Sequence, residues 1–297
     1  MGLTRETWNE RYLGLPVYVG QSKTKAFAYL KDRIWKCKQG WLGKLLTKAG
    51  KEILIKACAQ AIPIFAMLVF DLTKGLCEQM TAMICRFFSA QQEDDQKIHW
   101  LSAEKLTRSK KEGGLGFKDL HTFNLAMLAK QAWRLLDNLD SLCAQVLKAR
   151  YYLDSDIFHA EAKDGISYAW RSILQGVEVL KQGIIKRVGD CTTVKIWEDP
   201  WLPRNWDTKP FTPRRNSDVT MTAELMDSYT TTWDEQLVKY IFWAPNANLI
   251  LALPIKDEME DGWAWHLDHR GCFSVKSAYK LCKRVELVRA GEASSSN

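Results

Sequence analysis

Residues 12–63 read YLGLPVYVGQSKTKAFAYLKDRIWKCKQGWLGKLLTKAGKEILIKACAQAIP, and this stretch carries the strongest helical periodicity of the chain. Its first part, residues 12–20, places Gly and Pro among β-prone side chains, which predicts a strand or a tight hairpin. From Lys23 onward the apolar residues recur at helical spacing. The predicted inward face of this helix consists of Ala26, Phe27, Leu30, Ile34 and Cys37.

A second helix is predicted to begin near Gly50, after a break bracketed by Gly40 and Gly43. It should end or kink at Pro63, because proline cannot continue the hydrogen bonding of a helix. Its predicted inward residues are Ile53, Leu54, Ala57, Cys58 and Ala61.

The basic charge of the chain is concentrated at its N-terminal end. Residues 1–60 contain 12 Lys+Arg against 4 Asp+Glu, whereas the whole chain has 42 against 35. Everything after residue 60 is therefore close to neutral, and this asymmetry favours contact with a polyanion through the N-terminal block. The predicted nucleic-acid-binding residues are Lys25, Lys31, Lys36, Lys44, Lys48 and Lys51.

Two interpretations of this basic block stay open at the level of sequence. Lys44, Lys48 and Lys51 stand at i, i+4 and i+7, so an uninterrupted helix would align three ammonium groups. Such groups contact phosphates without reading base sequence. Gly50 leaves the continuity of that helix open, and the alternative is an ordinary solvated face. A similar choice between base stacking and core packing, with packing favoured, applies to Trp35, Trp41 and Trp133.

The rest of the first half predicts a helical bundle. Apolar residues at helical spacing predict helices over 72–89, 121–137 and 142–151. A short strand is expected over 97–101 and a flexible turn over 113–116. Residues 1–152 are therefore assigned to one helical region with an N-terminal hairpin.

The composition changes after Tyr152. A helix is predicted over 167–182, and IIKRVGDCTTVKIWED at 184–199 predicts a β-hairpin turned by Gly189 and Asp190. The run 261–283 predicts a strand, a turn at Gly271, a second strand and a helix. The expected fold class is mainly α with a smaller α+β part. The predicted divisions beyond the first region are 153–206 (helix plus β-hairpin connector), 207–220 (linker), 221–290 (small α+β region) and 291–297 (disordered tail).

The bulk composition predicts an intracellular protein, in the nucleus or the cytoplasm. No stretch approaches the roughly 20 apolar residues of a membrane span, and the N-terminus lacks the apolar segment of a signal peptide. The 8 Cys include no C-x-x-C pair, and several fall on apolar helical stripes. This usage suits free thiols in a reducing compartment.

Several motifs, in order along the chain, resemble plant LINE-type (non-LTR) retrotransposon reverse transcriptases downstream of their catalytic palm. The resemblance extends from about Tyr12 to Leu281. The motifs are YLGLP (12–16), KTKAFAYLKDRIWKCKQGW (23–41), GKEILIKACAQAIP (50–63), KIHWLSAEKLTRSKKEGGLGFKDLHTFNLAMLAKQAWRLL (97–136), VGDCTTVKIWEDPWLP (188–203) and GCFSVKSAYKL (271–281).

The resemblance implies roles for particular residues. Tyr12, Leu13 and Gly14 match the hairpin at the edge of the palm that helps to hold the primer end, and the helices after it match the thumb. GCFSVKSAYKL matches the opening of a zinc-binding reverse-transcriptase-associated domain, whose Cys/His ligands do not follow in this sequence. RFFSA at 86–90 departs from the Trp-rich pattern usual in this family.

Polymerisation by this chain alone is not expected. Reverse transcription needs carboxylates that hold two divalent metals at the incoming phosphates, and the resemblance begins downstream of the palm that supplies them. Asp94-Asp95 lies in a polar loop without flanking strand residues. We therefore predict no catalytic residues, no metal site and no cofactor; an intact relative would use Mg.

Two weaker patterns have alternative explanations. His266 and His269 lie near Cys272 and Cys282, but the spacing lacks the Cys pair of a zinc site, which favours hairpin residues. GGLGF at 113–117 lacks the GK[ST] of a phosphate-binding loop, which favours a connector.

The sequence favours a retroelement-derived, reverse-transcriptase-like fragment that is inactive alone. Its expected partner is an RNA or RNA–DNA duplex, bound without sequence preference, and no membrane. One alternative is the non-catalytic part of an active RNA-directed DNA polymerase whose palm is absent from this sequence. The other is a pseudogene product with no selected role.

Overall fold

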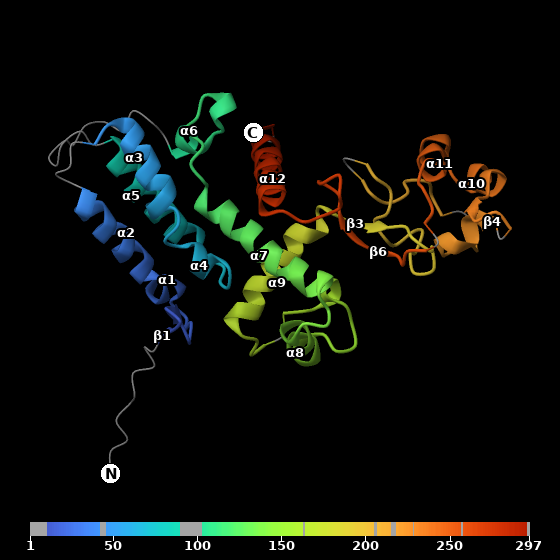
Figure 1. Cartoon of the computed structure of the whole chain (residues 1–297), viewed down its shortest axis with the longest axis horizontal. Coiled ribbons are helices and arrows are strands. Elements are labelled where there is room, and N and C mark those ends of the chain that lie inside the picture. The colour runs from blue at the N-terminus through green and yellow to red at the C-terminus, as the bar shows by residue number, and fades with distance from the viewer. Residues whose placement is uncertain are drawn as a thin grey trace, which may run out of the picture.

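The computed structural model describes residues 11–41, 46–89, 103–162, 164–204, 207–214, 218–227, 229–256 and 258–295. The described elements form an elongated molecule with three hydrophobic cores along its length (Figure 1). Helices predominate, and the strands form short antiparallel pairs. The mainly α fold with a smaller β part is therefore confirmed.

The first core is built by the N-terminal elements and lies at one end of the molecule (Figure 1). These elements are β1 (Arg11–Tyr12), β2 (Leu15–Pro16), α1 (Lys23–Ala26), α2 (Ala28–Trp41), α3 (Lys48–Leu54), the π-helix η1 (Ile55–Ala59), α4 (Ile64–Met67), α5 (Lys74–Ser89), α6 (Ala103–Thr107) and the 3₁₀ turn η2 (Lys110–Glu112). The predicted hairpin is present, since β1 pairs with β2. Phe27, Leu30 and Ile34 are buried as predicted. The predicted strand over 97–101 lies outside the described residues.

The inward face predicted for the second helix is wrong, and the helix also contains a π-turn. Gln60 N–H donates to the carbonyl oxygen of Ile55, five residues earlier, at 2.9 Å. A turn of this kind holds one more residue than an α-helical turn and so rotates the side chains that follow. Ile55 and Ala59 are buried, whereas Ile53 is 66% exposed. Pro63 ends this run and precedes α4, as predicted.

The second core lies at the centre of the molecule, around α7 and α9 (Figure 1). Its elements are α7 (Leu120–Asp137), α8 (Leu142–Tyr151), the 3₁₀ turn η3 (Ile157–His159), α9 (Tyr168–Lys181) and α12 (Val275–Ser295). The backbones of α7 and α9 nearly touch, because a Cβ placed at Gly176 would lie 2.4 Å from the carbonyl carbon of Leu128. The adjoining face of α7 carries the small buried residues Ala126, Ala129 and Ala132. Small side chains therefore determine how closely these helices pack.

Asn124 of α7 connects the central core to the first one. The side chain is fully buried, and its Oδ1 accepts from the Leu72 N–H at 2.7 Å. Its Nδ2 donates to the carbonyl oxygens of Met67 and Phe70, at 3.0 and 2.9 Å. One amide thus satisfies three backbone groups of the segment between α4 and α5, as burial of polar groups requires.

The helix α12 is held on the N-terminal end of α7 by polar contacts. Lys283 Nζ donates to Asp119 Oδ2 at 2.8 Å, and Thr122 Oγ1 donates to Glu286 Oε1 at 2.9 Å. Burial alone would raise the pKa of Asp119, but the hydrogen bonds from Lys283 and Thr122 lower it overall. The central core is thus completed by the last helix of the chain.

The third core lies at the far end of the molecule (Figure 1). Its described elements are β3 (Ile184–Arg187), the 3₁₀ turn η4 (Thr222–Leu225), β4 (Met226–Asp227), β5 (Thr232–Trp233), α10 (Glu235–Ile241), α11 (Ala244–Leu251) and β6 (Gly262–Trp265). The β3–β6 ribbon joins this end to the central core, where Trp265 is fully buried.

The β-hairpin predicted over 184–199 is wrong. β3 pairs with β6 in antiparallel register, from Ile184↔Trp265 to Arg187↔Gly262. The residues after β3 instead wrap the carboxylate of Asp261, which accepts from the N–H groups of Gly189, Cys191 and Thr193 at 2.7–3.1 Å.

Gly189 is required in this loop because a Cβ there would lie 2.1 Å from the Met259 carbonyl oxygen. The second strand predicted after Gly271 is also absent from the described residues, and Trp265 N–H makes a single bond to the Gly271 carbonyl oxygen.

The segments predicted as linker and tail are ordered where they are described. Within 207–220, Thr208 accepts from the N–H groups of Trp201 and Leu202, and Val219 accepts from the Trp197 indole. These bonds attach the segment to the third core. The helix α12 continues to Ser295 and so includes part of the predicted tail. The division into domains stays a prediction.

Among the described helices, none combines the length and the apolar composition needed to cross a bilayer.

Candidate nucleic-acid interface

A mixed basic and aromatic stripe runs along α2. Lys31, Trp35 and Lys38 stand at i, i+4 and i+7, so they share one side of the helix. Trp35 is 47% exposed, and the Lys38 ammonium lies 4.7 Å from its ring centroid. Lys31 donates to Gln79 Oε1 of α5 at 2.8 Å. The stripe therefore presents an accessible indole between two ammonium groups.

The other predicted cations are placed differently from one another. Lys25, Lys36 and Lys48 are exposed on α1, α2 and α3. Lys51 is half-buried, with its ammonium 5.3 Å from the Phe87 ring centroid. Its pKa is lowered, mainly by burial and secondarily by the charge of Lys48.

Lys44 lies outside the described residues, and the described helix that carries Lys48 and Lys51 begins at Lys48. Thr47 caps α3, its side chain accepting from the Gly50 N–H at 3.2 Å, so the helix starts at Lys48. The helix start predicted near Gly50 is thus two residues too late. A cap of this kind begins a new helix rather than continuing the previous one.

The described part of residues 11–41 carries almost only positive charge. It contains seven Lys+Arg and the single acid Asp32. Within the part of the chain that the structure describes, none of these seven cations forms an ion pair with a carboxylate. Unpaired surface cations are the groups that bind phosphates with release of counterions.

The turn matched to the primer-holding hairpin is exposed. Tyr12 and Leu13 are 72% and 73% exposed, and Gly14 is exposed beside them. Leu13 (φ 51°) and Gly14 (φ 80°) both occupy the left-handed region, which is typical of a two-residue type I′ hairpin turn. Leu13 adopts this conformation at an energetic cost, since its Cβ crowds the following carbonyl oxygen. The guanidinium of Arg11 lies 4.0 Å from the Tyr29 ring centroid and ties the hairpin to α2.

The tryptophans considered for base stacking fall into two groups. Trp35 is on the surface, whereas Trp41 packs on Phe87 with ring centroids 5.3 Å apart. Trp133 stacks on Phe273 at 5.9 Å. Packing contacts with other rings therefore hold Trp41 and Trp133 in place.

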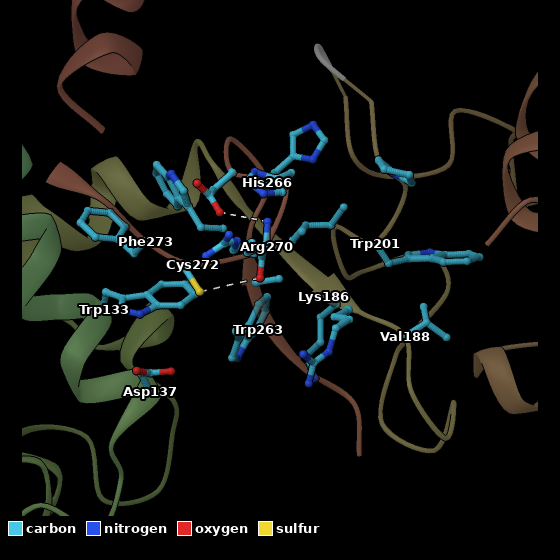
Figure 2. A pocket seen from close by; sticks show the side chains of 18 of the residues that line it. Trp133, Asp137, Lys186, Val188, Trp201, Trp263, His266, Arg270, Cys272 and Phe273 are labelled. Carbon is cyan, nitrogen blue, oxygen red and sulfur yellow. Dashed lines mark hydrogen bonds between the residues drawn. The ribbon is translucent and has the colours of Figure 1, made fainter. Parts of the chain in front are cut away.

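A second basic and aromatic site was not predicted from the sequence. It is a cavity of about 760 Å³ between the C-terminal half of α7, the β3–β6 ribbon and the residues Leu253, Pro254, Lys256 and Met259. Figure 2 shows Trp133 and Phe273 on one side, Trp201 and Val188 on the other, and Lys186, Trp263 and His266 between them.

The residues lining this cavity come from segments far apart in the chain, so no local motif marks it. The available signal was the abundance of Trp, 13 residues in all, beside charged residues.

Of the residues considered for a zinc site, His266, His269 and Cys272 line this cavity and Cys282 does not. Cys282 is buried in the central core, where burial raises the pKa of its thiol to about 11. Cys272 and His269 are exposed. Across the described ranges, no three His, Cys, Asp or Glu side chains form a group that could hold a metal ion.

Two proteins of Arabidopsis thaliana are similar in sequence to the chain. No protein-family model matches it. It is 27% identical over 290 residues to an Arabidopsis thaliana protein described as putative ribonuclease H protein At1g65750, and it spans 47% of that protein's length. It is 38% identical over 154 residues, 52% of this chain, to the Arabidopsis thaliana uncharacterized mitochondrial protein AtMg00310. Because the match covers 98% of the latter's length, the chain belongs to the family of the uncharacterized mitochondrial protein AtMg00310.

Proposed function

We propose that the chain is a retroelement-derived protein that binds nucleic-acid duplexes, RNA or RNA–DNA, without sequence preference. The observation that carries this proposal is the cationic surface of α1–α3, with its exposed Lys25, Lys36 and Lys48. The similarity to a putative ribonuclease H protein over 95% of the chain supports the retroelement origin. The resemblance of the sequence motifs to non-LTR reverse transcriptases supports it further.

The physical basis of the proposal is electrostatic. Lysines on a helix surface neutralise backbone phosphates and release counterions, so affinity falls as salt rises. Phosphate contacts of this kind are the same for every base sequence. The exposed Trp35 between Lys31 and Lys38 adds a flat apolar surface at the same place.

A filter-binding titration with an RNA–DNA duplex at several salt concentrations tests the proposal. The variant Lys25→Gln/Lys36→Gln/Lys48→Gln should bind more weakly, and the slope of log affinity against log salt should fall by about 2–3. The matched control changes Lys181, Lys195 and Lys239 to Gln, each of which is paired with a nearby glutamate. Equal loss in both triple variants, or a wild-type affinity independent of salt, would contradict the proposal.

A second candidate is that the chain works as the non-catalytic part of a larger RNA-directed DNA polymerase. The coverage of only 47% of the longer Arabidopsis relative favours this candidate. Supplying a reverse-transcriptase palm in trans should then restore primer extension. Extension by the palm that is unchanged by the chain would count against this function and leave duplex binding untouched.

A further inference from the structure

We propose that the cavity between α7 and the β3–β6 ribbon binds an unpaired, single-stranded segment of nucleic acid. This inference rests on the nucleic-acid binding proposed above and assigns a second site with a different strand preference. The site is separate from the N-terminal basic surface, since it lies between the central core and the far end of the molecule (Figures 1 and 2).

The first observation is the charge of the cavity wall. Two carboxylates, Asp137 and Asp268, line it together with six cations. The cations are Lys130, Arg134, Lys186, Arg187, Lys256 and Arg270. No ion pair between these six and a carboxylate occurs within the described ranges. The cavity therefore has a positive potential and favours an anionic ligand.

The second observation is the aromatic surface beside these charges. Trp263 is half-buried at the wall, with the Lys186 ammonium 5.0 Å from its ring centroid and Phe158 in a T-shaped contact at 4.9 Å. Lys186 and Trp263 are direct partners across the ribbon. On one side of the cavity, Trp133 is stacked on Phe273. Indole rings held by such contacts offer preformed stacking surfaces to bases.

Size and chemistry together select a single strand over a duplex. A volume of about 760 Å³ is in the range of small-ligand sites, roughly 300–1,000 Å³. That space admits bases and their sugar-phosphates, whereas the bases of a duplex are stacked on one another and cannot reach a recessed ring. Recognition through aromatic stacking is typical of unpaired strands. An acidic peptide would satisfy the cations but would leave the indoles without a stacking partner.

The test measures binding of the full chain to fluorescent oligo(dT) and to an RNA–DNA duplex. Trp263→Leu should weaken oligo(dT) binding about 5- to 150-fold, the effect of removing one stacked base. Its duplex affinity should stay within about twofold of wild type. The N-terminal triple lysine variant should show the opposite pattern. Oligo(dT) affinity of Trp263→Leu within about twofold of wild type would overturn the inference.

A second variant keeps the test decisive if Trp263→Leu does not fold, as judged by circular dichroism. Lys186→Gln/Arg187→Gln changes only side chains at the open wall, and it should lower the salt slope of oligo(dT) binding by about 1.4. Lys181→Gln/Lys239→Gln is the matched control, since both lysines pair with neighbouring glutamates. An unchanged slope in the Lys186/Arg187 variant would overturn the inference.

Two further results separate this inference from the proposed function. If poly-glutamate of equal charge displaces oligo(dT) as well as unlabelled oligo(dT) does, an acidic peptide is the better ligand and the inference falls. Absence of duplex binding, with oligo(dT) binding that is lost in Trp263→Leu, would remove the proposed duplex function and support the cavity assignment.

Discussion

Replacing Asn124 should destabilise the protein strongly, because this one amide satisfies three buried backbone groups. In Asn124→Ala the Leu72 N–H and the carbonyl oxygens of Met67 and Phe70 lose the partners seen in the structure. Leu72 and Met67 are themselves fully buried. A buried polar group left unpaired costs about 1–3 kcal/mol. Partial hydration of the carbonyls places the total loss in free energy of unfolding at about 3–5 kcal/mol.

Urea unfolding followed by tryptophan fluorescence and circular dichroism measures this loss. With a slope of about 3 kcal/mol/M, the midpoint should fall by at least about 1 M. Asn124→Asp should be at least as harmful, because a carboxylate still accepts from Leu72 N–H but faces two carbonyl oxygens without a proton to donate. Asn248, exposed on α11, provides the matched control, and Asn248→Ala should stay within about 0.5 kcal/mol of wild type. A similarly small change in Asn124→Ala would refute the proposed role of this amide.

Three further changes test other features. Gly176→Ala should cost about 1–3 kcal/mol in urea unfolding, since its methyl group would overlap the Leu128 backbone; a neutral result would show that α7 and α9 separate freely. Asp261→Asn should cost about 2 kcal/mol by weakening bonds to N–H groups such as that of Gly189. Burial alone would raise the pKa of Asp261, but these hydrogen bonds hold that pKa below its usual value. The stability that Asp261 contributes should therefore be complete above the usual pKa and be lost as the pH falls through the lower pKa of the folded state. An equally steep acid transition in Asp261→Asn would contradict this. Leu13→Asn should slow amide exchange in the β1–β2 hairpin about fivefold by relieving the left-handed strain of an exposed leucine; unchanged exchange would mean that the strain is negligible.

Matched controls for these changes are available in the chain. At Gly40, near the end of α2, no atom lies within 4 Å of the position that a Cβ would occupy, so Gly40→Ala should be neutral or stabilising. Asp137→Asn alters an exposed carboxylate at the end of α7 and should leave the acid transition unchanged.

The sequence predicted those elements that are determined by neighbouring residues, such as a helix cap or a tight turn. Residues 142–151 form α8 with the predicted bounds, because Ser141 caps it with a hydrogen bond from the Ala144 N–H. The turn at 12–15 likewise follows from its own residues. Apolar spacing misassigned the buried face of the second helix, where Ile55 and Ala59 are buried and Ile53 is exposed, and it contains no mark of the π-turn at Ile55–Ala59.

Features that depend on distant segments could not be predicted in this way. The residues after Arg187 have the alternation of a hairpin, yet β3 pairs with β6. The carboxylate of Asp261, next to β6, binds the loop that follows β3 through N–H groups such as that of Gly189. The same ribbon carries Lys186 and Trp263 to the cavity, and α7 supplies Trp133. Of the residues predicted to bind nucleic acid, Lys25, Lys36 and Lys48 are exposed on the surface. That they bind nucleic acid stays a prediction.

The position of α12 has a consequence for the order in which the chain folds. The side chains of Thr122 and Glu286 are hydrogen-bonded across 164 residues of sequence. During synthesis on the ribosome, the N-terminal end of α7 therefore lacks this partner until α12 has been made. Contacts of such long sequence separation form late and slowly. A nascent chain that has not reached Val275 exposes the part of α7 that α12 covers, and exposed apolar surface of this kind favours aggregation. Premature termination before α12 should therefore yield an insoluble product, even though most of the helices would already have been made.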